Sequence, residues 1–281
     1  MPPSPSSSAP LPHPDETPES LRQSSASAPS KTVARPWRSL PGAIAFYTQL
    51  PVPQGWLWEF THVARYAPLV GLMIGGLLAI AALAFTQVGM PPLTRAAVVV
   101  GLWVWITGGL HLDGAMDTAD GLGVTDPTRR LEVMSDSHTG AFGVMVAIAL
   151  VTLKIAALAE SAHALWLLPL VAGWGRWAQQ VAIARYPYLK PSGKGAFHKA
   201  ALPHWGYVLP SWALLLGLSV LPWVLRWSAP MTPLLLLSGG SAIALLVPAW
   251  FQRQLGGHTG DTYGATVEWT EALLLVLCTI G

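Results

Sequence analysis

Long apolar runs, separated by short polar stretches, dominate the chain from about residue 60 to its end. A helix needs ~20 predominantly apolar residues to cross the hydrocarbon core of a membrane, and seven runs come near this length. We therefore predict an all-α, polytopic membrane helical bundle of about seven transmembrane helices. The predicted spans are 66–88, 95–112, 140–159, 163–184, 206–226, 232–252 and 266–281.

Two stretches of different character precede the first span. Residues 1–38 are rich in Pro, Ser and Ala and show no apolar period, which predicts a disordered tail. Residues 39–53 are apolar but too short to span a membrane, which is typical of an interfacial or re-entrant helix. The predicted organisation is therefore a tail, 1–38, followed by one transmembrane domain, 39–281.

Composition agrees with a membrane protein. The chain is 52% hydrophobic and only 11% charged, whereas soluble domains carry roughly 25% charged residues. The single cysteine, Cys278, excludes an internal disulfide and a cysteine-built metal site. The net charge of +2 is too small to indicate nucleic-acid binding, so the lipid bilayer is the predicted large partner.

The basic residues predict the orientation of the bundle. In the seven-span topology, twelve of the sixteen Lys and Arg residues fall on the side of the N-terminus and two on the other side. Loops rich in Lys and Arg remain in the cytoplasm. We therefore expect a multi-pass protein of the cytoplasmic (inner) membrane, with the polar loops around 113–137, 185–205 and 253–265 facing the cytoplasm.

Three acidic residues follow the second apolar run within eight positions. Asp113, Asp117 and Asp120 are spaced by four and three, so a helix would place them on one face. Like charges this close repel unless a cation lies between them, and Mg²⁺ combines one or two carboxylates with a substrate phosphate. We predict that the three residues bind Mg²⁺. A solvated helix end is the alternative, although only 14 acidic residues occur in the whole chain.

Further polar residues are candidates for catalysis or substrate binding because they interrupt apolar segments or cluster in loops. They are His111, Thr118, Asp136, Ser137, Lys154, Arg176, Lys194, Thr259, Asp261 and Glu268.

Each group has its own physical reason. The amides that follow Ser137 begin a span, and a free helix N-terminus favours phosphate. Lys154 and Arg176 lie within apolar spans, where a cation is costly unless it faces carboxylates, phosphate or water. Lys194 belongs to a basic loop that could hold a phosphate, or only set the topology. Asp261 lies in a glycine-rich polar turn that suits close approach to a ligand.

Four motifs together resemble the cobalamin synthase family, adenosylcobinamide-GDP ribazoletransferase. The motifs cover Phe46–Pro53, Gly109–Gly121, Asp136–Gly143 and Gly256–Ala265, and the similarity runs from about residue 40 to the C-terminus. One departure is His138, because the family usually has a basic residue after the Asp-Ser pair.

The resemblance implies a magnesium-dependent transferase of the late vitamin B12 pathway. The enzyme would join adenosylcobinamide-GDP to α-ribazole, or its 5′-phosphate, and release GMP with adenosylcobalamin or its 5′-phosphate. Asp113, Asp117 and Asp120 would hold Mg²⁺, and one of them or Asp136 would orient or deprotonate the acceptor. Lys154, Arg176 and Lys194 would neutralise developing charge.

Two other functions compete with this one. The acidic motif is also similar to that of membrane CDP-alcohol phosphotransferases, but the chain lacks the Ala-Arg pair and the later paired Asp of their signature. A transporter with an acidic site at the membrane midplane is less favoured, because the acidic residues lie at span ends and no inverted repeat is visible.

Overall fold

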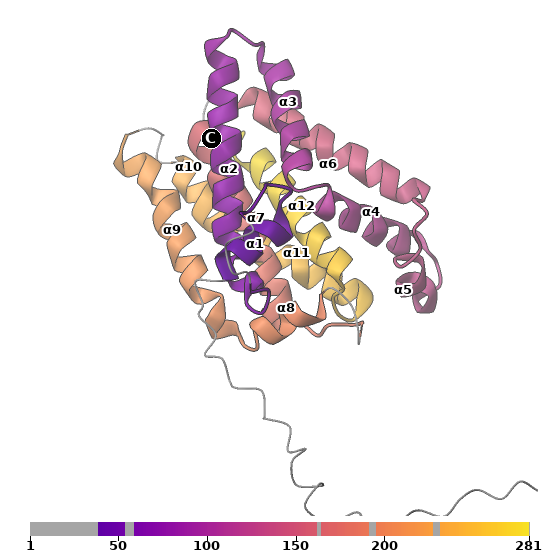
Figure 1. The fold of residues 1–281 in the computed structure, drawn as a ribbon. Helices are drawn as coiled ribbons and strands as arrows, with labels where there is room; N and C mark the ends of the chain where they lie inside the picture. Colours follow the sequence, from indigo (N-terminus) through magenta and orange to yellow (C-terminus); the bar gives the residue numbers. More distant parts are fainter. Residues whose placement is uncertain (1–38, 54–58, 162–163, 191–194, 227–230, 281) are drawn as a thin grey trace, which may run out of the picture. The chain divides into compact units, whose positions relative to one another are not determined.

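The structure is a computed structural model that describes residues 39–53, 59–161, 164–190, 195–226 and 231–280. These residues form helices joined by short turns (Figure 1), and an isolated bridge between Tyr188 and His258 is the only strand-like pairing in the described part. The predicted all-α class is confirmed. The tail predicted over residues 1–38 lies outside the described residues.

The helices follow one another with few long connections. Their bounds are α1 Ser39–Tyr47, α2 Val63–Gln87, α3 Pro92–Ile106, α4 Leu110–Gly123, α5 Arg130–Val133, α6 Ala141–Glu160, α7 Ala164–Arg185, α8 Ala196–Ala201, α9 Leu209–Val224, α10 Met231–Leu234, α11 Gly240–Leu255 and α12 Gly260–Leu277. Two 3₁₀ turns, η3 Pro127–Arg129 and η4 Trp205–Tyr207, precede α5 and α9, and a π-helical turn, η5 Leu235–Gly239, connects α10 to α11.

Helices α7 and α12 form the interior of the bundle. Helix α7 packs against α2, α11 and α12, and α12 packs against α4, α6, α7 and α11. Helix α2 approaches α7 closely at Gly71 and Gly75, where a Cβ atom would collide with the backbone of Ala172 and Leu168. Small residues allow this approach, which favours dispersion contacts between helices in a membrane.

Fewer helices meet the requirements of a membrane span than the sequence pattern predicts. Four helical segments of the described part are long and apolar enough: Val63–Gln87, Ala141–Glu160, Trp205–Val224 and Met231–Leu255. The pair α3 and α4 makes a fifth if it is counted as one bent span. The prediction of seven spans is therefore not confirmed. The predicted spans over 163–184 and 266–281 correspond to α7 and α12, which do not meet the requirements.

The polarity of α7 and α12 has a structural reason. Both helices are surrounded by other helices over most of their length, so their side chains meet protein rather than lipid. Helix α7 carries Arg176, Gln179 and Gln180, and α12 carries Glu268 and Glu271. Low hydropathy in these two helices therefore reflects their position inside the bundle, where polar side chains meet other protein groups.

The predicted span over 95–112 is not a single straight helix, because it breaks near its end, at residues 107–109. Helix α3 ends at Ile106, and Gly108 and Gly109 adopt left-handed φ angles of 62° and 70°. Glycine populates this region without steric cost. Helix α4 then leaves at 88° to α3, so we treat α4 as lying outside the spans.

Buried charges join α6 to α12. Lys154 Nζ lies 2.7 Å from Glu268 Oε2 and 2.6 Å from Glu271 Oε2, and all three residues are at most 6% exposed. Arg176 of α7, 1% exposed, adds a second cation with electrostatic contact to both glutamates. The prediction that Lys154 and Arg176 face the bundle interior is confirmed, and Lys154 faces carboxylates.

Replacing Lys154 should destabilise the fold. The variant Lys154→Met leaves two buried glutamates with Arg176 as their only nearby cation among the described residues. Removing one partner of a buried ion pair costs about 3–5 kcal/mol. We expect a lower thermal unfolding midpoint of the detergent-solubilised protein, and partial recovery in Lys154→Met/Glu268→Gln, which restores one cation to one anion.

The matched control is the exposed pair between Arg129 and Glu132, 3.7 Å apart. Glu132→Gln should change the free energy of unfolding by no more than about 0.5 kcal/mol. An unchanged midpoint in Lys154→Met would contradict the proposed coupling of these charges.

Candidate active site

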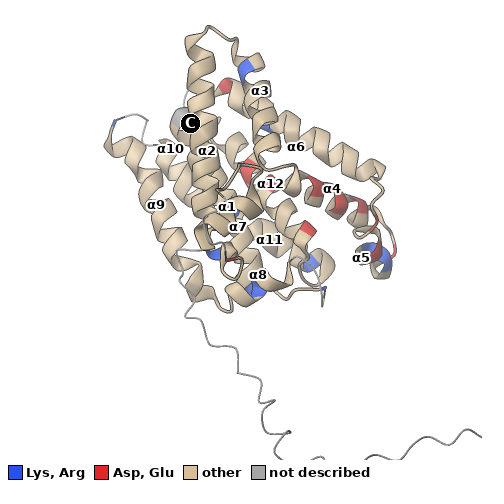
Figure 2. Ribbon diagram, viewed as in Figure 1, with Lys and Arg blue, Asp and Glu red and all other residues tan. Residues whose placement is uncertain are grey.

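Helix α4 presents the acidic motif as a helical segment, as the spacing predicts. Asp113, Asp117 and Asp120 all lie between Leu110 and Gly123, and Figure 2 shows acidic residues along α4. Asp113 occupies the first turn, where a carboxylate is favoured by the partial positive charge of the helix N-terminus.

Helices α4 and α12 cross in direct backbone contact. A Cβ atom at Gly114 would lie 2.6 Å from the carbonyl oxygen of Asp261, and one at Gly264 would lie 3.0 Å from the backbone of His111. Real Cβ atoms do not approach as closely as 2.6 Å, so the observed approach requires glycine at position 114, and at position 264 a larger residue would need the His111 backbone to shift. The crossing brings the start of α12, with Asp261, beside the acidic helix.

The start of α12 is fixed by its own hydrogen bonds. Thr259 and Thr262 form a capping box, in which the backbone N–H of each donates to the hydroxyl of the other. Burial lowers the pKa of His258 to about 4, so its neutral ring donates to the Pro248 carbonyl oxygen and contacts the Thr262 hydroxyl. This turn therefore holds Asp261 in place.

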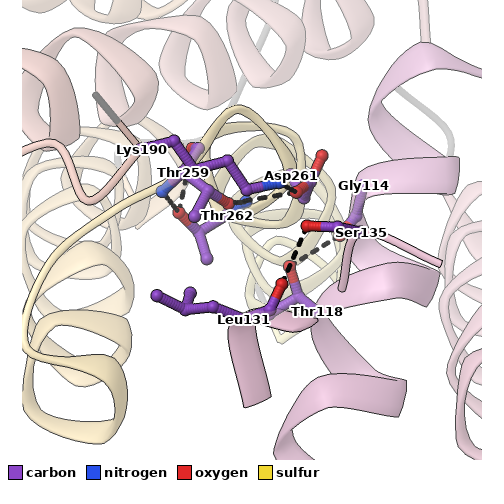
Figure 3. A network of polar contacts seen from close by, with 8 residues as sticks. All are labelled: Gly114, Thr118, Leu131, Ser135, Lys190, Thr259, Asp261 and Thr262. Carbon is purple, nitrogen blue, oxygen red and sulfur yellow. Dashed lines mark hydrogen bonds and ion pairs between the residues drawn. The ribbon is translucent and has the colours of Figure 1, made fainter. Parts of the chain in front are cut away.

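Asp261 has two polar partners of its own. Its Oδ2 lies 3.2 Å from Lys190 Nζ and accepts a hydrogen bond from the Thr259 hydroxyl at 3.2 Å. In Figure 3 the carboxylate stands between Lys190 and Thr259 on one side and Gly114 of α4 on the other. The side chain is half-buried and faces a region where a ligand could reach it.

A cavity of about 200 Å³ opens at this crossing. Its lining comes from α1, α4, α7, the start of α8 and α12. The lining residues are Phe46, Leu110, His111, Asp113, Gly114, Gln179, Gly195, His198, Gly260, Asp261, Tyr263 and Gly264. A second, more open cleft of about 500 Å³ lies along the bend before α4 and shares Leu110 and Asp113 with the cavity.

Carboxylates gather at and beside the cavity rim, where Asp113 and Asp261 line the cavity, and Asp117 and Asp120 of α4 do not line it but interact with them electrostatically. The pKa of Asp117 is raised to about 6, first by burial and then by the charges of Asp113, Asp261 and Asp120, while Lys190 opposes the shift. One cation therefore does not balance the acidic residues gathered here. No group of three or more His, Cys, Asp or Glu side chains in the described ranges is placed to hold a metal ion by itself.

Asp120 has a structural partner in α6. Its two carboxylate oxygens accept hydrogen bonds from the amides of Gly140, at 2.7 Å, and Gly143, at 2.8 Å. Two of the amides at the start of α6 that were expected to be free for phosphate are therefore already bonded to a carboxylate. The carboxylate stabilises the N-terminus of α6 and ties α6 to α4.

Several predicted residues do not line the cavity. Asp136 and Ser137 lie exposed in the loop before α6, where Asp136 binds the ring and backbone of His138. Lys154 and Glu268 are bonded to one another in the buried charge group. Lys194 lies outside the described residues.

The remaining candidates lie next to the cavity or in its wall. Thr118 is buried and donates to the Gly114 carbonyl oxygen at 2.6 Å, which gives it a role within α4. Arg176 Nη2 lies 3.4 Å from His111 Nδ1, and its guanidinium lies 4.8 Å from the Tyr47 ring centroid. His111, Asp113 and Asp261 meet at the cavity as the sequence predicts.

Sequence reasoning missed several lining residues. Gln179, His198 and Tyr263 line the cavity, and Lys190 is the ion-pair partner of Asp261. The sequence did indicate Gln179, because a polar amide is unusual in an apolar helix, just as the charge of Arg176 is in the same helix. Tyr263 and His198 offered none that separates them from ordinary interfacial residues.

Comparison with known proteins places these residues in a family. The family described as Cobalamin-5-phosphate synthase matches residues 39–279. A protein of Trichormus variabilis named adenosylcobinamide-GDP ribazoletransferase is 55% identical over 243 residues, covering 86% of this chain and 96% of the relative.

Two other relatives carry the same name. The protein of a Synechococcus strain is 51% identical over 249 residues, covering 87% of this chain and 97% of its own. The protein of a Synechocystis strain is 47% identical over 247 residues, with 85% and 93% covered. No solved structure matches the chain. The family match over residues 39–279 includes every described helix. The chain therefore belongs to the cobalamin-5-phosphate synthase family and is an enzyme of cobalamin synthesis.

Proposed function

We propose that this enzyme joins adenosylcobinamide-GDP to α-ribazole, or its 5′-phosphate, and releases GMP with adenosylcobalamin or its 5′-phosphate. The observation that carries the proposal is the meeting of Asp113 and Asp261, from distant parts of the chain, at one cavity in a member of this family. The names of the relatives supply the donor and the transferred group.

The reaction is a substitution at phosphorus. A ribose hydroxyl oxygen of the acceptor attacks the phosphorus bonded to the corrinoid, and the P–O bond to GMP breaks. The bonding pair leaves with GMP, and the hydroxyl proton passes to a base. Such a transfer relies on positioning and charge neutralisation rather than on a covalent enzyme intermediate.

The acidic residues suit a divalent cation. Asp113 and Asp117 would hold Mg²⁺, because burial and then the charges of Asp113, Asp261 and Asp120 raise the pKa of Asp117, and a bound cation would offset this repulsion. A site completed by substrate phosphate needs no cage of three protein ligands. Asp120, the third predicted ligand, retains free lone pairs beside its bonds to α6. When bound, the ion would neutralise phosphate oxygens and stabilise the leaving group.

Other residues would position the substrates. Lys190 lies beside Asp261 and would neutralise phosphate charge in place of Lys154, whose ammonium group is bonded to two glutamates. Asp261, held by Lys190 and Thr259, would orient an acceptor hydroxyl or contact the metal ion. Arg176 would act through His111 rather than on phosphate directly, because it is 1% exposed.

The chain would work in the cytoplasmic membrane with the cavity facing the cytoplasm. The proposal rests on the apolar helices and on the distribution of basic residues. Figure 2 shows basic residues mainly toward α5 and α8, with others on α3 and just after α9. Helices α7 and α12 would complete a seven-span topology as interior spans.

Asp117→Asn should abolish turnover while insertion into the membrane is retained. Asparagine preserves the shape of the side chain but removes the charge that holds the cation. We expect GMP release to fall by roughly 10³-fold, or about 4 kcal/mol in the barrier. Asp126→Asn is the matched control, because Asp126 is an exposed cap of η3 and asparagine caps equally well. Near-normal turnover of Asp117→Asn at saturating Mg²⁺ would remove the motif from the mechanism.

Asp261→Ala tests whether the start of α12 belongs to the same site. The variant removes a carboxylate from the cavity rim and leaves Lys190 unpaired. We expect GMP release from both substrates and Mg²⁺ to fall by on the order of 10²-fold or more. A wild-type protein that releases no GMP under these conditions would exclude the transferase function itself.

Cysteine labelling tests the orientation. In a Cys278→Ser background, Thr139→Cys before α6 and Thr94→Cys at the start of α3 both present exposed positions. A membrane-impermeant maleimide should label Thr94→Cys in intact cells and Thr139→Cys only after permeabilisation. The reverse pattern would place the cavity on the opposite side of the membrane.

A further inference from the structure

Four side chains that line the cavity contain buried polar atoms with no partner among the described residues. These atoms are His111 Nε2, Gln179 Oε1, His198 Nδ1 and Tyr263 OH. Each residue is at most 4% exposed. Buried polar groups in folded proteins nearly always have hydrogen-bond partners, so a polar ligand or water is expected at these atoms.

The wall behind these residues continues the same pattern. The ring of Tyr47 stacks on His111, with centroids 6.2 Å apart, and on His198, with centroids 6.0 Å apart. Its hydroxyl, and Nε and Nη1 of Arg176, also lack partners in the described part. Aromatic faces therefore alternate with unused hydrogen-bonding groups at the inner end of the cavity.

The geometry assigns donor and acceptor roles. Arg176 Nη2 lies 3.4 Å from His111 Nδ1, and a guanidinium group cannot accept a hydrogen bond. Nδ1 is therefore the acceptor, and the neutral ring carries its proton on Nε2, which becomes a donor. Gln179 Oε1 is an acceptor, whereas the Tyr263 hydroxyl serves as either.

The residues that line the inner end carry no formal charge, and the nearby cation, Arg176, lies behind them against His111 and is 1% exposed. Asp113 and Asp261 are the only described lining residues with a charged side chain; Asp113 is exposed and Asp261 half-buried, whereas the four unpartnered side chains are buried. A phosphate group at the inner end would have no cation in the lining to balance it. The matching ligand is neutral, flat enough to lie against aromatic rings, and equipped with both donors and acceptors.

We propose that the inner end of the cavity binds the nucleoside part of a substrate, while the phosphates remain at the acidic rim. The ribose hydroxyls and a ring nitrogen would satisfy Gln179, Tyr263 and His111. This inference rests on the proposed function, which offers two nucleosides of this chemistry, guanosine and ribazole. At about 200 Å³ the cavity suits one nucleoside and leaves the larger corrinoid outside, where the cleft of about 500 Å³ also reaches Asp113.

The test measures binding, which does not require turnover. The Kd of GMP and of α-ribazole 5′-phosphate is measured with the purified full chain and Mg²⁺ by calorimetry, for wild type, Gln179→Met and Tyr263→Phe. Losing one hydrogen bond should raise the Kd of one nucleotide about tenfold, equivalent to about 1.4 kcal/mol. The nucleotide affected identifies the bound nucleoside.

Gln252→Met is the matched control. Gln252 also has a buried, unpartnered Oε1 in the described part, but it does not line the cavity, so its variant should bind both nucleotides as the wild type does. Tyr263→Phe removes a single oxygen atom and should disturb the fold less. Its nucleotide affinities therefore decide the question if Gln179→Met does not fold.

The outcomes separate this inference from the reaction itself. A tenfold weaker affinity for one nucleotide in either folded variant supports the nucleoside site. Unchanged affinities in both variants, equal weakening for the two nucleotides, or the same effect in Gln252→Met would overturn it. Failure of the proposed function is seen separately, as absence of GMP release by a wild type that still binds a nucleotide.

Discussion

The candidate active site depends on the close crossing of α4 and α12. Gly114 and Gly264 allow the two backbones to touch, and a methyl group at position 114 would separate the helices, while one at position 264 would press on the His111 backbone. Because Asp113 and Asp117 belong to one helix and Asp261 to the other, this separation would also part the carboxylates. The glycines of the motifs therefore determine the geometry of the site as much as the acidic residues do.

One stripe of α12 serves both the site and the fold. Asp261, Gly264, Glu268 and Glu271 follow one another at intervals of three, four and three residues, which places them on one helical face. The first two face the crossing with α4, and the glutamates bind Lys154 of α6. The buried ion pairs thus fix the rotation of α12, and with it the direction of Asp261. Glu268, which was expected to contact substrate, instead helps to orient α12 through its ion pair with Lys154.

Local patterns predicted the helical class, the acidic helix and the interior position of Lys154. The spacing of Asp113, Asp117 and Asp120 is a property of neighbouring residues, which a sequence displays directly. The pairing of Asp120 with the α6 amides and of Asp261 with Lys190 depends on tertiary packing. The seven-span prediction treated every apolar run alike, although α7 and α12 meet protein rather than lipid, and the glycine bend after Ile106 shortened another run.

The division of the cavity follows from the cost of burying charge. An unpaired ion in a low-dielectric interior is far more costly than a neutral polar group with a hydrogen bond. Carboxylates that repel one another therefore lie at the rim, where Asp113 is exposed and solvent or a cation can reach it. Deeper positions hold Gln179, Tyr263 and neutral histidines instead. In the proposed reaction phosphorus is the reacting atom, so the chemistry would take place at the rim, and the deeper part of the cavity would recognise the uncharged end of a substrate.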